Sequence, residues 1–329
     1  MISAKLDGDC RYGFRIVGSC AEARWLVVAT AAFSAYVACD PLAQIDSEAY
    51  LSAFQFGDDF QQRVDAYGRV DVKGFKGDCW SPWLWFDIDR ENDINAALSD
   101  TRRLAAFMSE RYRLDGDEML IFYSGSKGFH VGVPTSLFNA AASAQFNGVC
   151  KRVAEAIASQ ANIIIDRGVY DKVRPFRAPN SRHPKTGRHK RRLAYDELLG
   201  LSIEAVIRLS QNPSEFEVPD MPPANDQAVA DWIDSAQAMT RVAVTKSERQ
   251  SDGTGLHLNK LTRRLIANIE MIAAGDRHRF LFSAAVNLGD FDCPAALAHA
   301  LLTDAGLDSG LSPTDVSRQI ECGLKHNKS

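Results

Sequence analysis

The segment Trp83–Arg90, WLWFDIDR, places two aspartates among large apolar residues. Four apolar side chains are followed by Asp87, Ile88 and Asp89, in which charged and apolar residues alternate. This pattern predicts a buried strand whose end reaches a functional site. Residues two apart on a strand share a face, so Asp87 and Asp89 are predicted to point the same way. Two neighbouring carboxylates repel each other, and a cation between them relieves that repulsion. Oxygen ligands suit Mg²⁺ or Mn²⁺, the ions of nucleotidyl transfer; the alternative is a strand end with two solvated or capping carboxylates.

Size and composition are those of a soluble globular protein. The chain has 329 residues, of which 46% are hydrophobic and 24% charged, and this length predicts about two domains. The seven cysteines show no CxxC or CxxH spacing, so no zinc is expected. The polar N-terminus MISAKLDGDC predicts no secretory signal, and the apolar run 25–39 is too short for a bilayer span. We therefore expect a cytoplasmic protein without a membrane segment, and a monomer.

The order of elements around the two aspartates predicts an α+β fold. Before them, helices are predicted over Glu22–Cys39 and Ser47–Val64. After them, the pattern predicts in turn a helix (Asp93–Tyr112), two strands (Glu118–Tyr123 and Phe129–Val133), a helix (Ala141–Gln160) and a strand (Ala161–Asp166). With the first strand this gives βαββαβ, the order of an RRM-like or ferredoxin-like sheet. An additional α/β unit is expected at the N-terminus.

A proline-rich segment predicts the domain boundary. Residues 212–226 contain four prolines among polar residues, which is typical of a linker between a catalytic domain 1–211 and a second domain 227–329. The second domain is predicted to be a small all-α domain. Its helices are expected over Leu256–Ala273, from Asp276 to near Gly289, and from Pro294 and Pro313 onward.

The segment Ser124–His130, SGSKGFH, is a candidate phosphate-binding turn between two strands. Its glycines allow a ligand to approach the backbone, and its hydroxyls and its lysine can bind a triphosphate. It lacks the residue order GxxxxGK[ST] of the Walker A phosphate-binding loop. If Phe129 lies in the core, His130 faces the site. Candidate nucleotide-binding residues here are Ser124, Ser126, Lys127 and His130; the alternatives are an ordinary Gly-Ser hairpin and a surface histidine.

A third carboxylate and a basic segment follow. Asp166 ends the last predicted strand and would complete a two-metal nucleotidyl-transfer site, unless it is simply another strand-end aspartate. Residues 167–192 hold ten of the 38 lysines and arginines and one acid, Asp171. A solvated basic face is the alternative, but this skew favours phosphate contacts. Arg174 and Arg177 are candidates for nucleotide binding. Candidates for nucleic-acid binding are Arg182, Lys185, Arg188, Lys190 and Arg191.

Taken together, FDID, SGSKGFH and IIDRGVY followed by RPFRAPNSRHPKTG resemble the three motifs of the archaeo-eukaryotic primase superfamily, in its primase-polymerase branch. The second motif is also similar to that of the polymerase domain of bacterial end-joining ligases. The resemblance spans roughly residues 80–195. It implies a catalytic metal-binding triad, phosphate contacts from the turn, and triphosphate or template contacts from basic residues. The residues carried over are Asp87, Asp89 and Asp166 for the triad, His130, Ser124, Ser126 and Lys127 for the turn, and Arg174, Arg177 and Lys185 for the basic contacts.

The implied function is that of a DNA primase or primase-polymerase. Such an enzyme condenses NTPs or dNTPs on a single-stranded DNA template in a plasmid, phage or other replicon, with a replicative helicase as a candidate partner. The stretch GDRHRFLFSAAVNLGDFDCPAALAHALL is similar to the helical module that follows such domains in plasmid and phage primases. The chain departs from many relatives in lacking a cysteine-rich zinc element. The alternatives are a repair polymerase that only extends ends, a catalytically silent nucleic-acid-binding module, and a metal-dependent nuclease.

Overall fold

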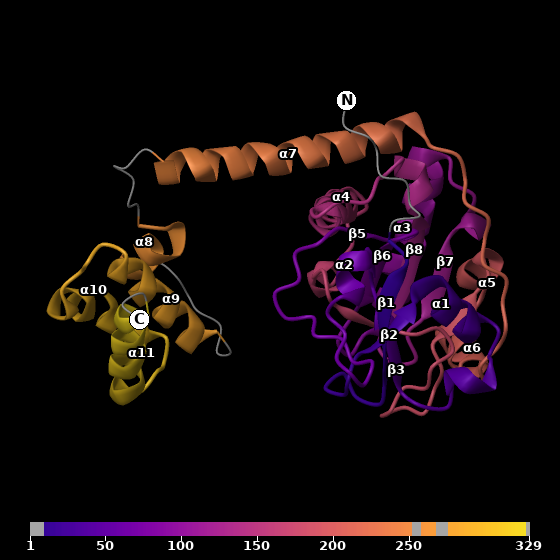
Figure 1. Cartoon of the computed structure of the whole chain (residues 1–329), viewed down its shortest axis with the longest axis horizontal. Helices are drawn as coiled ribbons and strands as arrows, with labels where there is room; N and C mark the ends of the chain where they lie inside the picture. The colour runs from indigo at the N-terminus through magenta and orange to yellow at the C-terminus, as the bar shows by residue number, and fades with distance from the viewer. Residues whose placement is uncertain (1–9, 252–257, 268–275, 327–329) are drawn as a thin grey trace. The chain divides into compact units, whose positions relative to one another are not determined.

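The computed structural model describes residues 10–251, 258–267 and 276–326 (Figure 1). The chain divides into two compact units, Met1–Thr240 and Arg241–Ser329. The first unit combines helices with two β-sheets, and every element described in the second unit is a helix. Within the described ranges, no helix combines the length and the apolar character needed to cross a bilayer.

The segment that carries Asp87 and Asp89 is strand β6, Trp83–Asp89, as predicted. It lies at one edge of a four-stranded antiparallel sheet in the order β10-β7-β8-β6. The other strands are β7 (Leu120–Tyr123), β8 (Gly128–Pro134) and β10 (Arg191–Leu193). Trp83 to Phe86 and Ile88 are buried, because helices pack on this sheet and Trp85 contacts Phe176 of the second sheet. The apolar run is therefore enclosed from both sides, and the aspartates stand where the strand ends.

Two helices cover this sheet. Helix α3, Ile94–Tyr112, follows β6, and helix α4, Phe146–Gln160, follows β8; both contact β6. Asp93 caps α3 by accepting a hydrogen bond from Ala96 N at 2.9 Å, which satisfies one of the free donors at a helix start. The predicted helix 93–112 is confirmed, whereas α4 begins later than the predicted position 141.

The second sheet has six strands, with β1 pairing with β2, β3 and β4, and β9 pairing with β3. Its strands are β1 (Tyr12–Val17), β2 (Trp25–Val28), β3 (Ala49–Ser52), β4 (Gln55–Phe56), β5 (Cys79–Trp80) and β9 (Pro175–Arg177). Helix α1, Ala29–Val37, occupies only the later part of the helix predicted over 22–39.

The helix predicted over 47–64 is wrong. Strands β3 and β4 and the short helix α2, Asp58–Gln61, occupy this range. Tyr50, Phe54, Phe56 and Phe60 are buried, so the apolar residues that suggested a helical face are buried by strand pairing with β1 instead. Pairing with a distant strand overrides local spacing here.

The strand predicted over 161–166 is also wrong. Ile163 is buried but Ile164 is 58% exposed, and Asn162 adopts a left-handed conformation with φ of 52° directly after α4. The chain then passes β6 with a single main-chain hydrogen bond in which Asp166 N donates to Asp87 O at 2.8 Å. One such bond does not make a ladder, yet it brings Asp166 beside Asp87.

The proline-rich segment 212–226 belongs to the first unit and packs on the rest of it. Ser136 Oγ donates to Pro222 O at 2.8 Å, and Asn225 N donates to Leu137 O at 2.9 Å. Helix α7, Asp226–Ser251, follows, and its Trp232 lies 5.3 Å from the Phe146 ring, centroid to centroid. The division between the units therefore falls within α7 and not in the proline-rich segment, because the carbonyl and amide groups of this segment bond to the first unit.

The second unit is built from short helices around its own core. They are α8 (Lys260–Ile266), α9 (Arg277–Gly289), α10 (Ala295–Asp308) and α11 (Pro313–Lys325). Leu281, Leu302 and Ile320 meet in this core. The helix starts predicted at 294 and 313 are confirmed. The predicted helix 256–273 corresponds to α8, and both its predicted ends lie outside the described residues.

Candidate active site

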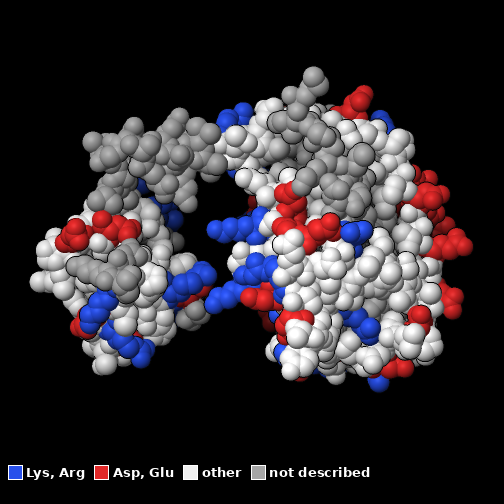
Figure 2. All heavy atoms as spheres, in the orientation of Figure 1, with Lys and Arg blue, Asp and Glu red and all other residues white. Residues whose placement is uncertain are grey.

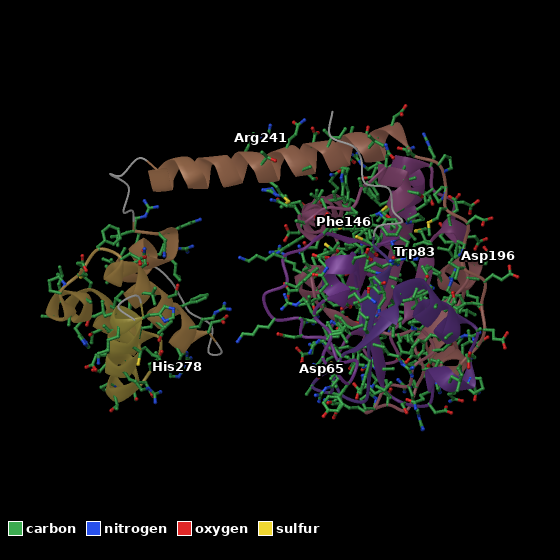
Figure 3. All side chains as sticks on the ribbon, viewed as in Figure 1. Asp65, Trp83, Phe146, Asp196, Arg241 and His278 are labelled. Atoms are coloured by element: carbon green, nitrogen blue, oxygen red, sulfur yellow. The ribbon has the colours of Figure 1, made fainter. Side chains whose placement is uncertain are left out.

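The structure brings eight of the predicted residues to one cleft of about 350 Å³ between the two sheets. They are Asp87, Asp89, Ser124, Ser126, Lys127, His130, Arg174 and Arg177. The register of β6 and β8 explains the grouping, since Asp87 lies opposite His130 and Asp89 lies opposite Gly128. Figure 3 labels Trp83 at the start of β6, whose other end reaches the cleft.

Asp87 lies where its negative charge is disfavoured. Burial raises its pKa to about 7, and the Asp89 and Asp166 carboxylates add to this rise, while Lys190 and Arg174 oppose it. Its Oδ1 atom is buried and makes no hydrogen bond within the described residues. His130 Nε2 lies 3.6 Å from that oxygen. A buried carboxylate oxygen without a partner is costly, so the position suits an added cation.

His130 is held as a neutral ring in the cleft wall. Phe129 is fully buried and His130 is only 6% exposed, and the two point to opposite faces of β8. Burial, followed by the charges of Lys190 and Arg177, lowers the pKa of His130 well below its usual value. Its ring stacks on Phe176 with centroids 4.3 Å apart. A neutral imidazole in this position can donate one hydrogen bond and accept another.

The turn between β7 and β8 is ordered by its own hydrogen bonds. Ser124 N donates to Gly128 O at 2.9 Å, and Gly128 N donates to Ser124 Oγ at 3.3 Å. A Cβ at Gly128 would clash with Ile88 O and with the Asp89 carboxylate, so the turn fits against β6 only with glycine there. Lys127 Nζ lies 3.2 Å from Asp89 Oδ2, and that carboxylate raises the pKa of the lysine. A cation therefore projects beside the aspartate pair.

Asp166 lies beside Asp87 but its carboxylate is engaged elsewhere. Its Oδ1 accepts a hydrogen bond from Gly168 N at 2.8 Å, and its Oδ2 is 3.8 Å from Arg174 NH2. Among the residues that the structure describes, no three histidine, cysteine or acidic side chains are arranged to hold an ion. Asp87 and Asp89 fit a divalent cation by their chemistry, whereas Asp166 would have to turn away from Arg174 to join them.

The basic segment divides between the cleft and its surroundings. Arg177 NH2 donates to Tyr50 OH at 3.2 Å and lies 3.7 Å from Glu48 Oε1. Lys185 and Arg182 are exposed. Figure 2 shows both basic and acidic side chains on the visible face of the first unit.

Lys190 corrects the prediction of a nucleic-acid contact. It is 1% exposed, its Nζ donates to Arg177 O at 2.8 Å, and that Nζ lies 4.4 Å from the Phe176 ring centroid. Burial is the first cause that lowers its pKa well below the usual range. A side chain held in this way cannot reach a DNA backbone at the surface. Arg191 next to it is half-buried in β10, and its Nε has no partner within the described part of the chain.

Several residues that line the cleft were not among the predicted site residues. They are Cys20, Tyr50, Val169, Pro175, Phe176 and His183. Tyr50 stood in a predicted helix, so its position on strand β3 was not foreseen. Val169, Pro175, Phe176 and His183 lie within the segment 167–192 that was singled out by its charge, whereas Cys20 and Tyr50 had no such signal.

Comparison with known proteins finds a similarity in structure and no match in sequence. No family model matches the chain, and no curated protein matches its sequence. Among solved structures the chain is similar to one described as the crystal structure of primase RepB', with a TM-score of 0.38 and 13% identity over 96% of this chain and 90% of that chain.

Proposed function

We propose that the chain is a template-directed nucleotidyltransferase of the primase or primase-polymerase type. The observation that carries the proposal is the Asp87–Asp89 pair, which has a buried unpartnered oxygen and faces a Gly-Ser-Lys turn in one cleft. Paired carboxylates beside a lysine and serine hydroxyls suit a nucleoside triphosphate and its metal ion. The resemblance of the three sequence motifs points to the same chemistry.

Mg²⁺ or Mn²⁺ would be held by Asp87 and Asp89, and by Asp166 once it has turned from Arg174. Such ions neutralise the carboxylates and stabilise the attacking and leaving oxygens of an in-line displacement. The chain's own groups position the nucleotide: Lys127 supplies a charge beside Asp89, and the neutral His130 supplies a hydrogen bond. Positioning and charge neutralisation account for most catalysis of phosphoryl transfer.

Single-stranded DNA is the proposed template. Arg182 and Lys185 are exposed, and Arg188 NH1 donates to Tyr123 OH at 3.2 Å at the start of the phosphate-binding turn. These side chains can contact the phosphodiester backbone, which is the sequence-independent part of nucleic-acid binding. Either NTPs or dNTPs would be the substrates, and a replicative helicase is a candidate partner.

One observation favours a second candidate, a nucleotide- or DNA-binding module without catalysis. The Asp166 carboxylate accepts from Gly168 N and lies beside Arg174, so the third carboxylate already has other partners. If this pairing persists with nucleotide bound, the chain would bind its ligands and catalyse no transfer.

The test is nucleotide incorporation with Mg²⁺ or Mn²⁺ on single-stranded DNA, with and without a pre-annealed primer. The wild-type chain is compared with the Asp87→Ala/Asp89→Ala double variant, using NTPs and dNTPs separately. Products without a primer, absent in the variant, are expected of a primase. Products only with a primer would indicate an extending repair polymerase. Binding without products would favour the silent module, and degradation of labelled DNA would indicate a nuclease.

A further inference from the structure

A second, apolar cavity of about 310 Å³ lies in the first unit. Its walls come from strands β1, β3 and β9 of the six-stranded sheet, from β6 of the four-stranded sheet and from helix α1. Aromatic rings make up much of this wall, namely Phe14, Phe33, Trp83, Trp85 and Phe176. A cavity of this size and character is typical of a site for a small molecule.

The cavity is separate from the cleft of the candidate active site. Phe176 and Arg177 of β9 line both spaces, so this strand forms the partition between them. Asp87, Asp89 and Lys127 line the cleft and are not part of the cavity wall. A ligand in the cavity would therefore leave the proposed metal and phosphate positions free.

One buried amine in the cavity wall forms no ion pair with any described residue. Lys190 lines the cavity and is 1% exposed. Its Nζ lies 5.3 Å from the ring centroid of Trp85 and 4.4 Å from that of Phe176, and both rings belong to the cavity wall. Within the described part of the chain, this nitrogen donates one hydrogen bond, to Arg177 O at 2.8 Å. A protonated lysine has three N–H donors, so two remain for a ligand.

The other basic residue of the wall already has an anionic partner. The guanidinium of Arg177 lies 3.7 Å from Glu48 Oε1 and donates to Tyr50 OH at 3.2 Å. For Lys190, burial and then the charge of Arg177 lower the pKa. An anion in the cavity would oppose both effects, because an opposite charge close to a buried amine favours its protonated form. The wall thus favours a ligand with an anionic group at Lys190 and an apolar body elsewhere.

Apolar side chains stand exposed at the mouth of the cavity. Val218 and Met221 of the proline-rich segment line it and are 40% and 43% exposed. Thr30 and Ser34 of helix α1 also line it and are exposed. A ligand whose apolar body fills the cavity would remove part of this apolar surface from water, which favours binding.

We propose that this cavity binds a small aromatic carboxylate, with the anionic group paired to Lys190 and the rings packed against the aromatic wall. Aromatic rings suit the wall better than an alkyl chain does, because pairs of rings gain free energy beyond that of the area they bury. The site goes beyond the proposed function and does not depend on it.

The experiment is calorimetric titration of the full chain with 2-naphthoate and with the uncharged 2-naphthylmethanol. Lys190→Met keeps the length of the side chain and removes its charge. We expect it to weaken binding of 2-naphthoate about tenfold or more, because a hydrogen bond between charged groups is lost, and to leave binding of 2-naphthylmethanol unchanged. The control Lys127→Met removes a lysine of the cleft and should bind both compounds as wild type does.

A second pair of variants tests the location and does not alter any buried side chain. Ser34 and Ala31 are both exposed on α1, but only Ser34 lines the cavity. Ser34→Trp should weaken binding of both compounds about tenfold or more, because the indole ring obstructs the mouth. Ala31→Trp should bind both as wild type does. This pair decides the location even if Lys190→Met fails to fold.

No binding of 2-naphthoate by wild type would overturn the proposal, as would wild-type affinity in Lys190→Met or in Ser34→Trp. Equal weakening of 2-naphthylmethanol in Lys190→Met would show that the lysine acts through packing and not through charge, which contradicts the proposal. Weakening in Lys127→Met would place the anion in the cleft and would also overturn it. None of these results bears on nucleotide incorporation, which tests the proposed function separately.

Discussion

Asp87 occupies an environment that opposes its own charge. Its side chain is 16% exposed, and burial together with two neighbouring carboxylates raises its pKa to about 7. A protein gains no stability from such a carboxylate when it is ionised. An added cation would offset the repulsion between the carboxylates. Perturbed pKa values of this kind are typical of functional sites.

Asp87→Asn tests this at the level of stability. The pKa of Asp87 rises from the ordinary value of 3.8 to about 7 in the folded chain, so the folded state holds its proton to higher pH. Stability therefore falls as pH rises from about 4 to about 7. Without divalent metal, the free energy of unfolding of Asp87→Asn relative to wild type should therefore increase by about 2.5 kcal/mol from pH 5 to pH 8.

Urea unfolding at the two pH values measures this difference. The exposed Asp234 offers the control Asp234→Asn. Its difference from wild type in free energy of unfolding should be the same at both pH values. A gain for Asp87→Asn that does not grow with pH would contradict the account of Asp87.

At the scale of elements, the turn between β7 and β8 depends on a glycine that contacts strand β6. A Cβ at Gly128 would meet the Ile88 carbonyl and the Asp89 carboxylate. Gly128→Ala is therefore expected to shift β8 from β6, costing about 1 to 3 kcal/mol of stability and lowering triphosphate affinity. Gly200→Ala is the matched control, because nothing lies within 4 Å of a Cβ there.

Thermal unfolding and nucleotide titration of both variants check this prediction. If Gly128→Ala and Gly200→Ala behaved alike, the turn would not be the element that holds the aspartates and the phosphate site together.

The elements that the sequence predicted well are those with strong local patterns. Strand β6 is a continuous apolar run, and helix α3 has an apolar face and a capping aspartate at Asp93. The turn at Gly125 adopts a positive φ of 86°, as its residue type suggests. These features follow local sequence patterns, and for β6 the pairing with β8 agrees with the local pattern.

The wrong elements depend on distant contacts. Strand β3 exists because it pairs with β1 and β9, and the segment 161–166 lacks a ladder because Ile164 faces solvent. For the site, two aspartates, the turn and His130 could be predicted from motifs. The burial of Lys190 beneath Phe176 could not, because it depends on how the second sheet packs against the first.

At the scale of the whole molecule, the division between the units lies inside helix α7. The first part of this helix belongs to the first unit. Asp231 accepts hydrogen bonds from Arg111 and from Tyr112 OH, the latter at 2.7 Å, and Trp232 packs against Phe138 and Phe146. Every residue that lines the candidate active site also belongs to the first unit.

Two truncations test this division. A chain of residues 1–240 should unfold cooperatively and bind the triphosphate with wild-type affinity, because it keeps the packing of Trp232 and the whole cleft. A chain of residues 1–211 should be less stable by several kcal/mol, since aromatic residues under α7 become exposed, at about 1.5 to 3 kcal/mol each. Equal stability in urea would place the boundary at the proline-rich segment instead.

The central claim is that the cleft between Asp89 and the turn 124–128 catalyses nucleotidyl transfer. Its most direct test is addition of one labelled nucleotide to a primer annealed to a DNA template, with Mg²⁺ or Mn²⁺, by wild type, Asp89→Asn and Asp234→Asn. The account predicts template-complementary addition by wild type and Asp234→Asn, and background addition by Asp89→Asn although it remains folded. Addition by Asp89→Asn at the wild-type rate, or none by any of the three, would contradict it.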